Sequence, residues 1–135
     1  MKRSEFLEQV AHFVKMAWEF CLKARREGFL ALEDVINSTK GSRIWQIGMR
    51  LTVDGVDVEI IDKLLSNMIC LEQDEMAKRL KVMQKDVVLS IRNGDNPRIL
   101  MLWLASQIDE EEMEAIGEMI KDSEFYEDSG WGNRS

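Results

Sequence analysis

Apolar residues recur every three or four positions along almost the whole chain, and this pattern most constrains the fold. The first such stripe consists of Phe6, Val10, Phe13, Val14, Ala17, Cys21 and Ala24. No segment shows the alternation typical of a strand, and no internal repeat stands out. Because 45% of the 135 residues are hydrophobic and 32% are charged, the chain suits one domain with a modest core. The sequence therefore predicts an all-α fold.

Helix-capping patterns mark most of the expected boundaries. Asn96 precedes Pro97 at a first helical position, and Asp109 with Glu112 forms a capping-box pattern. We predict a bundle of short helices over about residues 4–27, 29–36, 43–53, 97–106 and 109–121. The last two would form a C-terminal helical hairpin.

One much longer helix is expected in the middle of the chain. No Gly or Pro occurs between Val56 and Asn93, and residues 77–81 are all strong helix formers. We therefore predict a continuous helix over about residues 57–92, which starts at an Asp57 cap. A helix of about 35 residues would span roughly 50 Å. A single domain of this size could not easily cover its whole apolar stripe.

The net charge of −7 is distributed unevenly. Residues 1–50 carry nine Lys and Arg against six Asp and Glu, whereas residues 51–135 carry nine against nineteen. This acidic excess argues against nucleic-acid binding. Residues 122–135 are acidic and then rich in Gly, Ser and Asn, so we expect a frayed tail. No apolar run reaches the ~18 residues that span a bilayer, and the first residues are too polar for a signal peptide, so we expect a cytoplasmic protein.

No constellation of residues indicates catalysis. The lone His12 has no Cys or carboxylate at metal-ligand spacing, and there is no glycine-rich phosphate loop. The acidic run at 109–112 favours the helix macrodipole without any metal. Cys21 and Cys70 lie within helical patterns, which predicts two buried free thiols. We therefore expect neither an enzyme nor a bound metal or cofactor.

One segment combines opposite charges around a glycine. Its charged residues are Lys23, Arg25, Arg26, Glu27, Glu33 and Asp34. On an unbroken helix, eight residues rotate by about 800°, so Arg25 and Glu33 would lie within roughly 80° of each other; a kink at Gly28 would change this. The residues alone are compatible with two interpretations, a solvated face with weak ion pairs or a charged contact surface.

Three motifs resemble parts of the MotA family of flagellar stator proteins. Residues 24–34, with the sequence ARREGFLALED, are similar to the segment after the family's second transmembrane helix. Residues 47–57, IGMRLTVDGVD, resemble the motif G-L-x-L-V-V-D-G-T-D farther along the same cytoplasmic loop. Residues 87–100, VVLSIRNGDNPRIL, resemble the cytoplasmic tail after the fourth transmembrane helix. The three matches occur in the family's order and together cover about residues 10–115.

The chain departs from the family between the second and third motifs. The family has two membrane helices there, which help to form the ion pathway with the partner protein MotB; here only a polar stretch at about 75–85 remains. The resemblance implies one helical domain over residues 1–121, in which a loop of residues 1–76 joins a tail of residues 82–121. Such a chain is either an engineered deletion or a natural relative without membrane helices, and the parent protein would lie in the bacterial inner membrane. We expect no ion conduction by this chain alone, and contact with MotB only through the absent membrane part.

The resemblance also implies a partner. In the family, an Arg just before the glycine and a Glu just after it engage charged residues of the rotor protein FliG and transmit torque, and these positions match Arg25 and Glu33. Candidates that rank lower are Lys23, Arg26, Glu27 and Asp34. The expected function is therefore a rotor-interacting region that binds the C-terminal domain of FliG. The alternative is a helical adaptor or regulator that binds partner helices through its Met-rich apolar stripe.

The predicted long helix has a consequence for assembly. A continuous helix through residues 77–81 would make the loop and the tail run in the same direction, so the tail could not fold back on its own loop. We therefore predict a homo-oligomer, in which the tail docks on another copy as in a domain-swapped dimer.

Overall fold

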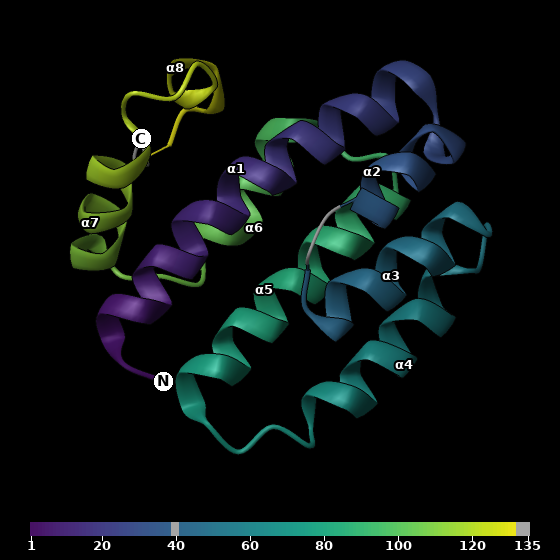
Figure 1. The fold of residues 1–135 in the computed structure, drawn as a ribbon, viewed down its shortest axis with the longest axis horizontal. Coiled ribbons are helices and arrows are strands. Elements are labelled where there is room, and N and C mark those ends of the chain that lie inside the picture. Colours follow the sequence, from purple (N-terminus) through teal and green to yellow (C-terminus); the bar gives the residue numbers. More distant parts are fainter. Residues whose placement is uncertain (39–40, 132–135) are drawn as a thin grey trace.

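Eight α-helices and one short 3-10 helix make up the regular structure of the described residues, 1–38 and 41–131, in the computed structural model (Figure 1). In chain order these are α1 (Arg3–Glu27), η1 (Phe29–Ala31), α2 (Leu32–Ser38), α3 (Arg43–Val53), α4 (Val58–Ile69), α5 (Glu75–Arg92), α6 (Pro97–Ala105), α7 (Glu110–Ile120) and α8 (Tyr126–Ser129). This part of the chain contains no strand, so the predicted all-α fold is confirmed. None of its helices combines the length and the apolarity that crossing a bilayer requires.

The two longest helices, α1 and α5, lie side by side at the centre of the molecule (Figure 1). Helices α3 and α4 pack on α5, whereas α6 packs on both central helices and α7 packs on α1. Trp45 of α3 is among the largest side chains of the core, and it is fully buried. The rings of Phe13 and Phe20 each meet Trp45 edge-on, with centroids 5.2 Å away.

Local capping signals place several helix ends where they are predicted. Helix α3 has the predicted bounds, and the Ser42 hydroxyl accepts a hydrogen bond from the backbone of its first turn. The Asn96 side chain caps α6 in the same way. Asp109 and Glu112 form both hydrogen bonds of the predicted capping box at the start of α7. The first helix starts at Arg3, one residue before the predicted start, and Lys2 occupies its cap position.

The prediction of one long helix over residues 57–92 is wrong. The chain leaves the helix after Ile69 and re-enters it at Glu75. In the break, the Glu72 carboxylate accepts backbone hydrogen bonds at 3.0 and 3.1 Å, and the Asp74 carboxylate caps α5 at 2.8 Å. Such side-chain bonds to the backbone compete with helix formation. The break also lets α4 fold against α5, so that tertiary burial outweighs helix propensity.

The break removes the premise of the predicted domain swap. Helices α6 and α7, which belong to the tail, pack on α1 of the same chain (Figure 1). They contact α1 more extensively than each other, so they do not form the expected C-terminal hairpin. The tail therefore folds back on its own loop, because the turn at residues 70–74 reverses the chain direction.

The prediction of a frayed tail is wrong for residues 122–131, and residues 132–135 lie outside the described part. The side chains of Phe125 and Trp131 are buried. Phe125 contacts Trp18 of α1, with ring centroids 6.2 Å apart, and the Trp131 Nε1 donates a hydrogen bond of 3.3 Å to the Met113 carbonyl. These apolar anchors hold the segment around α8 against α1 and α7 despite its polar composition, and α8 itself packs on α6.

Candidate protein interaction site

The charged segment at residues 23–34 lies where α1 ends and the chain turns into α2. Gly28 adopts φ +88°, a left-handed conformation that favours glycine, and it ends α1. Arg25 and Arg26 therefore lie in the last turn of α1, while Glu33 and Asp34 lie in the first turn of α2. Both placements complement the helix macrodipoles. Because the helix is broken at Gly28, the angular relation expected for an unbroken helix does not apply.

The six predicted site residues differ in how the fold uses them. Lys23 and Glu27 form an ion pair of 3.2 Å along α1. The Arg25 Nη1 donates a hydrogen bond of 3.0 Å to the Gly94 carbonyl, which ties α1 to the turn before α6. Among these six residues, Arg26, Glu33 and Asp34 have exposed side chains with no bonding partner in the described part of the chain, residues 1–38 and 41–131.

Arg92, which is not among the predicted site residues, connects this segment to two others. Its Nε donates a hydrogen bond of 2.8 Å to the Val56 carbonyl, and one Nη donates to the Gly55 carbonyl at 3.3 Å. Its guanidinium also lies over the Phe29 ring, 5.7 Å from the centroid. The three motifs therefore meet at one end of the molecule, which we call the turn end: residues 23–34, 50–57 and 92–95 (Figure 1).

A small hollow of about 90 Å³ opens at the turn end beside Glu33. Its wall includes Arg50 and Asp54 from the end of α3. The Arg50 Nη2 donates a hydrogen bond of 2.8 Å to the Asn37 side chain, which holds the guanidinium near the hollow. Arg50 lies in the motif at residues 47–57, which was the one indication in the sequence that it belongs to the site. Its proximity to Glu33 depends on how α2 packs on α3 and has no local pattern.

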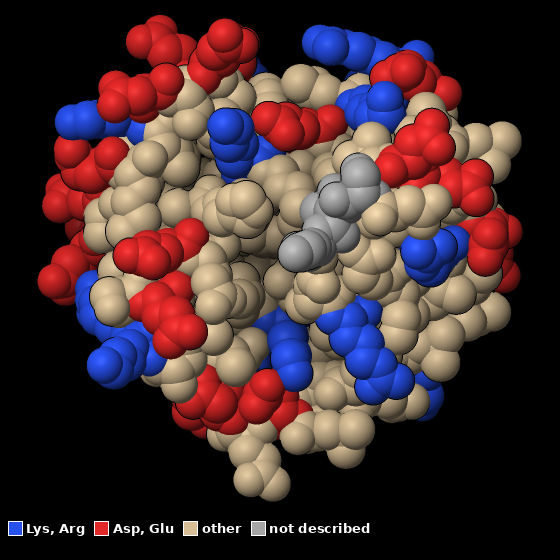
Figure 2. Space-filling model, viewed as in Figure 1, with Lys and Arg blue, Asp and Glu red and all other residues tan. Residues whose placement is uncertain are grey.

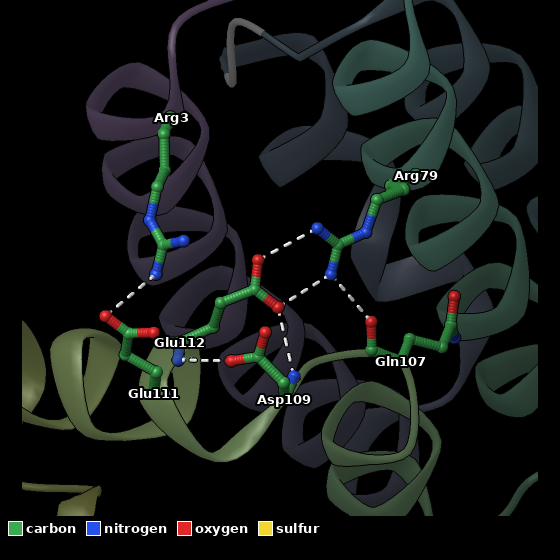
Figure 3. Close-up of polar contacts among 6 residues, drawn as sticks. All are labelled: Arg3, Arg79, Gln107, Asp109, Glu111 and Glu112. Carbon is green, nitrogen blue, oxygen red and sulfur yellow. Dashed lines mark hydrogen bonds and ion pairs between the residues drawn. The ribbon is translucent and has the colours of Figure 1, made fainter.

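A second polar cluster joins the tail to the rest of the fold (Figure 3). Arg79 donates two hydrogen bonds of 2.8 Å to the two oxygens of Glu112 and one of 3.0 Å to the Gln107 carbonyl. Its guanidinium also lies 4.6 Å from the centroid of the Phe6 ring. Arg79 holds the pKa of Glu112 at about 2, well below its ordinary value. This cluster connects α5, α7 and α1. Its side chains bond to one another and stabilise the fold, and they do not form an exposed contact surface.

The remaining chemistry-bearing residues are scattered. His12 is exposed on α1. The described residues contain no group of three or more His, Cys, Asp and Glu side chains that could hold a metal ion. Both cysteines are free, but only Cys21 is buried, and burial raises the pKa of its thiol to about 11. The prediction of burial is wrong for Cys70, because the helix break exposes it at the end of α4.

Comparison with known proteins gives one informative match. No family model matches the chain, and no solved structure matches it. Motility protein A of Borreliella burgdorferi is 41% identical over 69 residues, which are 51% of this chain and 25% of the relative. The chain thus spans about a quarter of the relative's length. It therefore contains a region that is related to motility protein A.

Proposed function

We propose that this chain is the rotor-facing region of a MotA-like flagellar stator subunit. The turn end would contact the C-terminal domain of the rotor protein FliG through charged side chains. The observation that carries the proposal is the set of exposed, oppositely charged side chains at the turn end, where the three MotA-like motifs meet. In the described part of the chain, Arg26, Glu33 and Asp34 have no internal partner.

The physical properties of such contacts suit a moving interface. Exposed ion pairs are each worth about 0–1 kcal/mol, so they form and break readily. Complementary charge also accelerates encounter without requiring a tight complex. A large apolar contact would instead resist the motion of one surface past the other.

The internal bonds of the turn end indicate which of its charged side chains remain available to contact a partner protein. One N–H of Arg25 is occupied by the Gly94 carbonyl, but a guanidinium has five N–H donors, so the others remain for a partner. Arg26 has no such internal bond among the described residues and becomes an equally strong candidate. Lys23 and Glu27 largely neutralise each other and rank lower. On this basis Arg25, Arg26, Glu33 and Asp34 form the proposed contact.

Two parts of the family's function would lie outside this chain. Contact with MotB and ion conduction both belong to membrane helices, and no described helix has the properties of one. The proposed role is therefore confined to charged contacts with the rotor.

The alternative role, an adaptor that captures helices on its Met-rich stripe, is less favoured. That role needs an accessible stripe, but Met83, Val87 and Ile91 are buried in the core. It also predicts binding that salt hardly weakens, whereas the charged contact predicts binding that salt weakens strongly.

The test is binding of the purified FliG C-terminal domain at low salt. Arg25→Glu and Glu33→Lys should each weaken binding at least several-fold, because each places a like charge against the partner. Matched controls are Lys15→Glu and Glu19→Lys, which make the same charge changes at exposed sites on α1. Affinity that is unchanged by both turn-end substitutions, or reduced equally by the controls, would contradict the proposal.

A further inference from the structure

The acidic excess of the protein is concentrated in its last helices. Residues 109–131 contain ten Asp and Glu but one Lys, a net charge of −9. Since the whole chain carries −7, the remaining residues carry +2. Acidic side chains gather on the left side of the molecule in Figure 2, where α7 and α8 lie in Figure 1. This surface lies away from the turn end (Figure 1).

The same surface contains a groove of about 710 Å³ between α7 and the segment around α8. Its lining includes three carboxylates of α7, together with the aromatic rings of Tyr126 and Trp131. Both aromatic side chains lie over Gly117 of α7: an added Cβ there would lie 3.6 Å from Trp131 and 3.8 Å from the Tyr126 hydroxyl, which are ordinary contact distances. The bond from Trp131 to the Met113 carbonyl fixes one wall of the groove.

Glu111 suits the first turn of α7 and lies 3.8 Å from Arg3, but the other two carboxylates that line this groove are not explained by the stability of α7. Glu114 and Glu118 are four residues apart, and such like-charge pairs destabilise a helix by about 0.2–0.5 kcal/mol. Glu118 also lies in the last turn, where the macrodipole disfavours a negative charge. Lys121 pairs with Glu118 at 2.8 Å, but Glu114 has no ion-pair partner in the described part of the chain. Charges that cost folding energy at a groove are characteristic of a binding surface.

We propose that the groove between α7 and α8 binds an arginine-containing segment of a partner protein. A guanidinium can form paired hydrogen bonds with carboxylates and stack on an aromatic ring, and the groove offers both. The carboxylates are those of Glu111, Glu114 and Glu118. The Tyr126 ring is partly exposed, and its hydroxyl has no hydrogen-bond partner among the described residues, so it can accept from the same side chain.

The experiment measures the affinity of the whole chain for fluorescently labelled hexa-arginine, hexa-lysine and hexa-glutamate by anisotropy at 50 mM salt. Hexa-arginine should bind more tightly than hexa-lysine, because the lysine ammonium lacks the planar fork, and hexa-glutamate should not bind. The double substitution Glu114→Lys with Glu118→Lys should weaken hexa-arginine binding at least tenfold. Backbone amide shifts on binding should be confined to residues 111–118 and 126–131.

The matched control is Glu8→Lys with Glu19→Lys, which makes the same charge change at exposed positions of α1. It should weaken hexa-arginine binding less than about threefold through the change in overall field. Circular dichroism on both double variants checks that each is folded. Equal weakening by the two double variants, or no binding by the unmodified chain, would overturn the proposal. Arg25→Glu and Glu33→Lys should leave hexa-arginine binding essentially intact, which separates this site from the proposed rotor contact.

Discussion

At the scale of single residues, the Arg79–Glu112 pair is a two-bond polar contact between α5 and α7. The Glu112 side chain is only 5% exposed, whereas that of Arg79 is 36% exposed. Removing one member of such a pair costs more than the pair contributes, because the other charge remains desolvated. The contact with the Phe6 ring and the capping box adds further partners, so each member is held by several bonds. This pair should therefore set part of the acid sensitivity of the fold.

Acid should destabilise the protein through Glu112. Its pKa is about 2 in the fold against an ordinary 4.5, so its stabilising contribution is complete above about pH 4.5 and is lost as pH falls toward 2. The difference corresponds to at most about 3 kcal/mol, and exposure of Arg79 reduces this to about 2 kcal/mol. In urea denaturation, the free energy of unfolding of the wild type should exceed that of Glu112→Gln by about 2 kcal/mol at pH 7. At pH 2.5 the difference should be less than about 1 kcal/mol.

Other carboxylates titrate in the same range but are common to both proteins, so the comparison isolates Glu112. The control is Glu118→Gln, which removes an exposed ion pair with Lys121 and should change stability by less than about 0.5 kcal/mol at either pH. If the stability difference between wild type and Glu112→Gln were the same at pH 7 and pH 2.5, this assignment would be wrong.

At the scale of helices, local signals were sufficient to predict some elements but not others. The start of α6 and the capping box of α7 depend on residues within one turn, and both are predicted correctly. The break at residues 70–74 contains no Gly or Pro, and it forms because α4 and α5 bury their apolar faces against each other. Trp131 likewise lies in a segment of polar composition, and its partner Met113 is 18 residues away. Long-range packing of this kind leaves no local pattern.

The candidate site shows the same division. The charged side chains of residues 24–34 lie at the surface, on either side of a helix break at Gly28. Both features follow from local signals, a glycine and a run of polar residues. The link through Arg92 joins residues 36 and 37 positions apart in the chain, and that between Arg79 and Glu112 joins residues 33 positions apart. These distant residues meet because α5 packs on its neighbours. One long helix over residues 57–92, as expected from the sequence, would not allow that packing.

Close packing of α3 on its neighbours should make Gly48 sensitive to substitution. An added Cβ would lie 2.7 Å from Val88 Cγ2 and 3.2 Å from Leu65 Cδ1, so α3 would have to move away from α4 and α5. Val88 is β-branched and has little rotamer freedom to relieve the clash. Gly48→Ala should therefore lower the free energy of unfolding by about 1–3 kcal/mol in urea, despite the higher helix propensity of Ala.

The control for this prediction is Gly117→Ala in α7, the same substitution at a position where the added Cβ would lie no closer than 3.6 Å to its neighbours. Its effect should be smaller, because these are ordinary contact distances and no neighbour has to move. An unchanged or increased stability of Gly48→Ala would mean that α3 can shift away from α5 without loss.

At the scale of the whole molecule, the turn at residues 70–74 decides which copy of the tail covers α1. With the turn present, α5 reverses direction and brings α6 and α7 back onto α1 of the same chain (Figure 1). The apolar surfaces that the tail buries would be the same if a second chain supplied them. The choice between the two arrangements therefore depends mainly on the free energy of the turn relative to continued helix.

Removing the turn signals should convert the chain into a swapped dimer. In the triple variant Glu72→Ala, Gln73→Ala and Asp74→Ala, the carboxylates that bond the backbone of the turn are replaced by the strongest helix former. Helices α4 and α5 should then merge, and the tail should dock on a second chain. Light scattering should give twice the mass of the unmodified chain, increasingly so at high concentration. The matched control, with Gly at all three positions, loses the same side chains but favours the turn, and its mass should not change. A triple-alanine variant with the mass of the glycine control would show that burial of α4 against α5 holds the turn without these carboxylates.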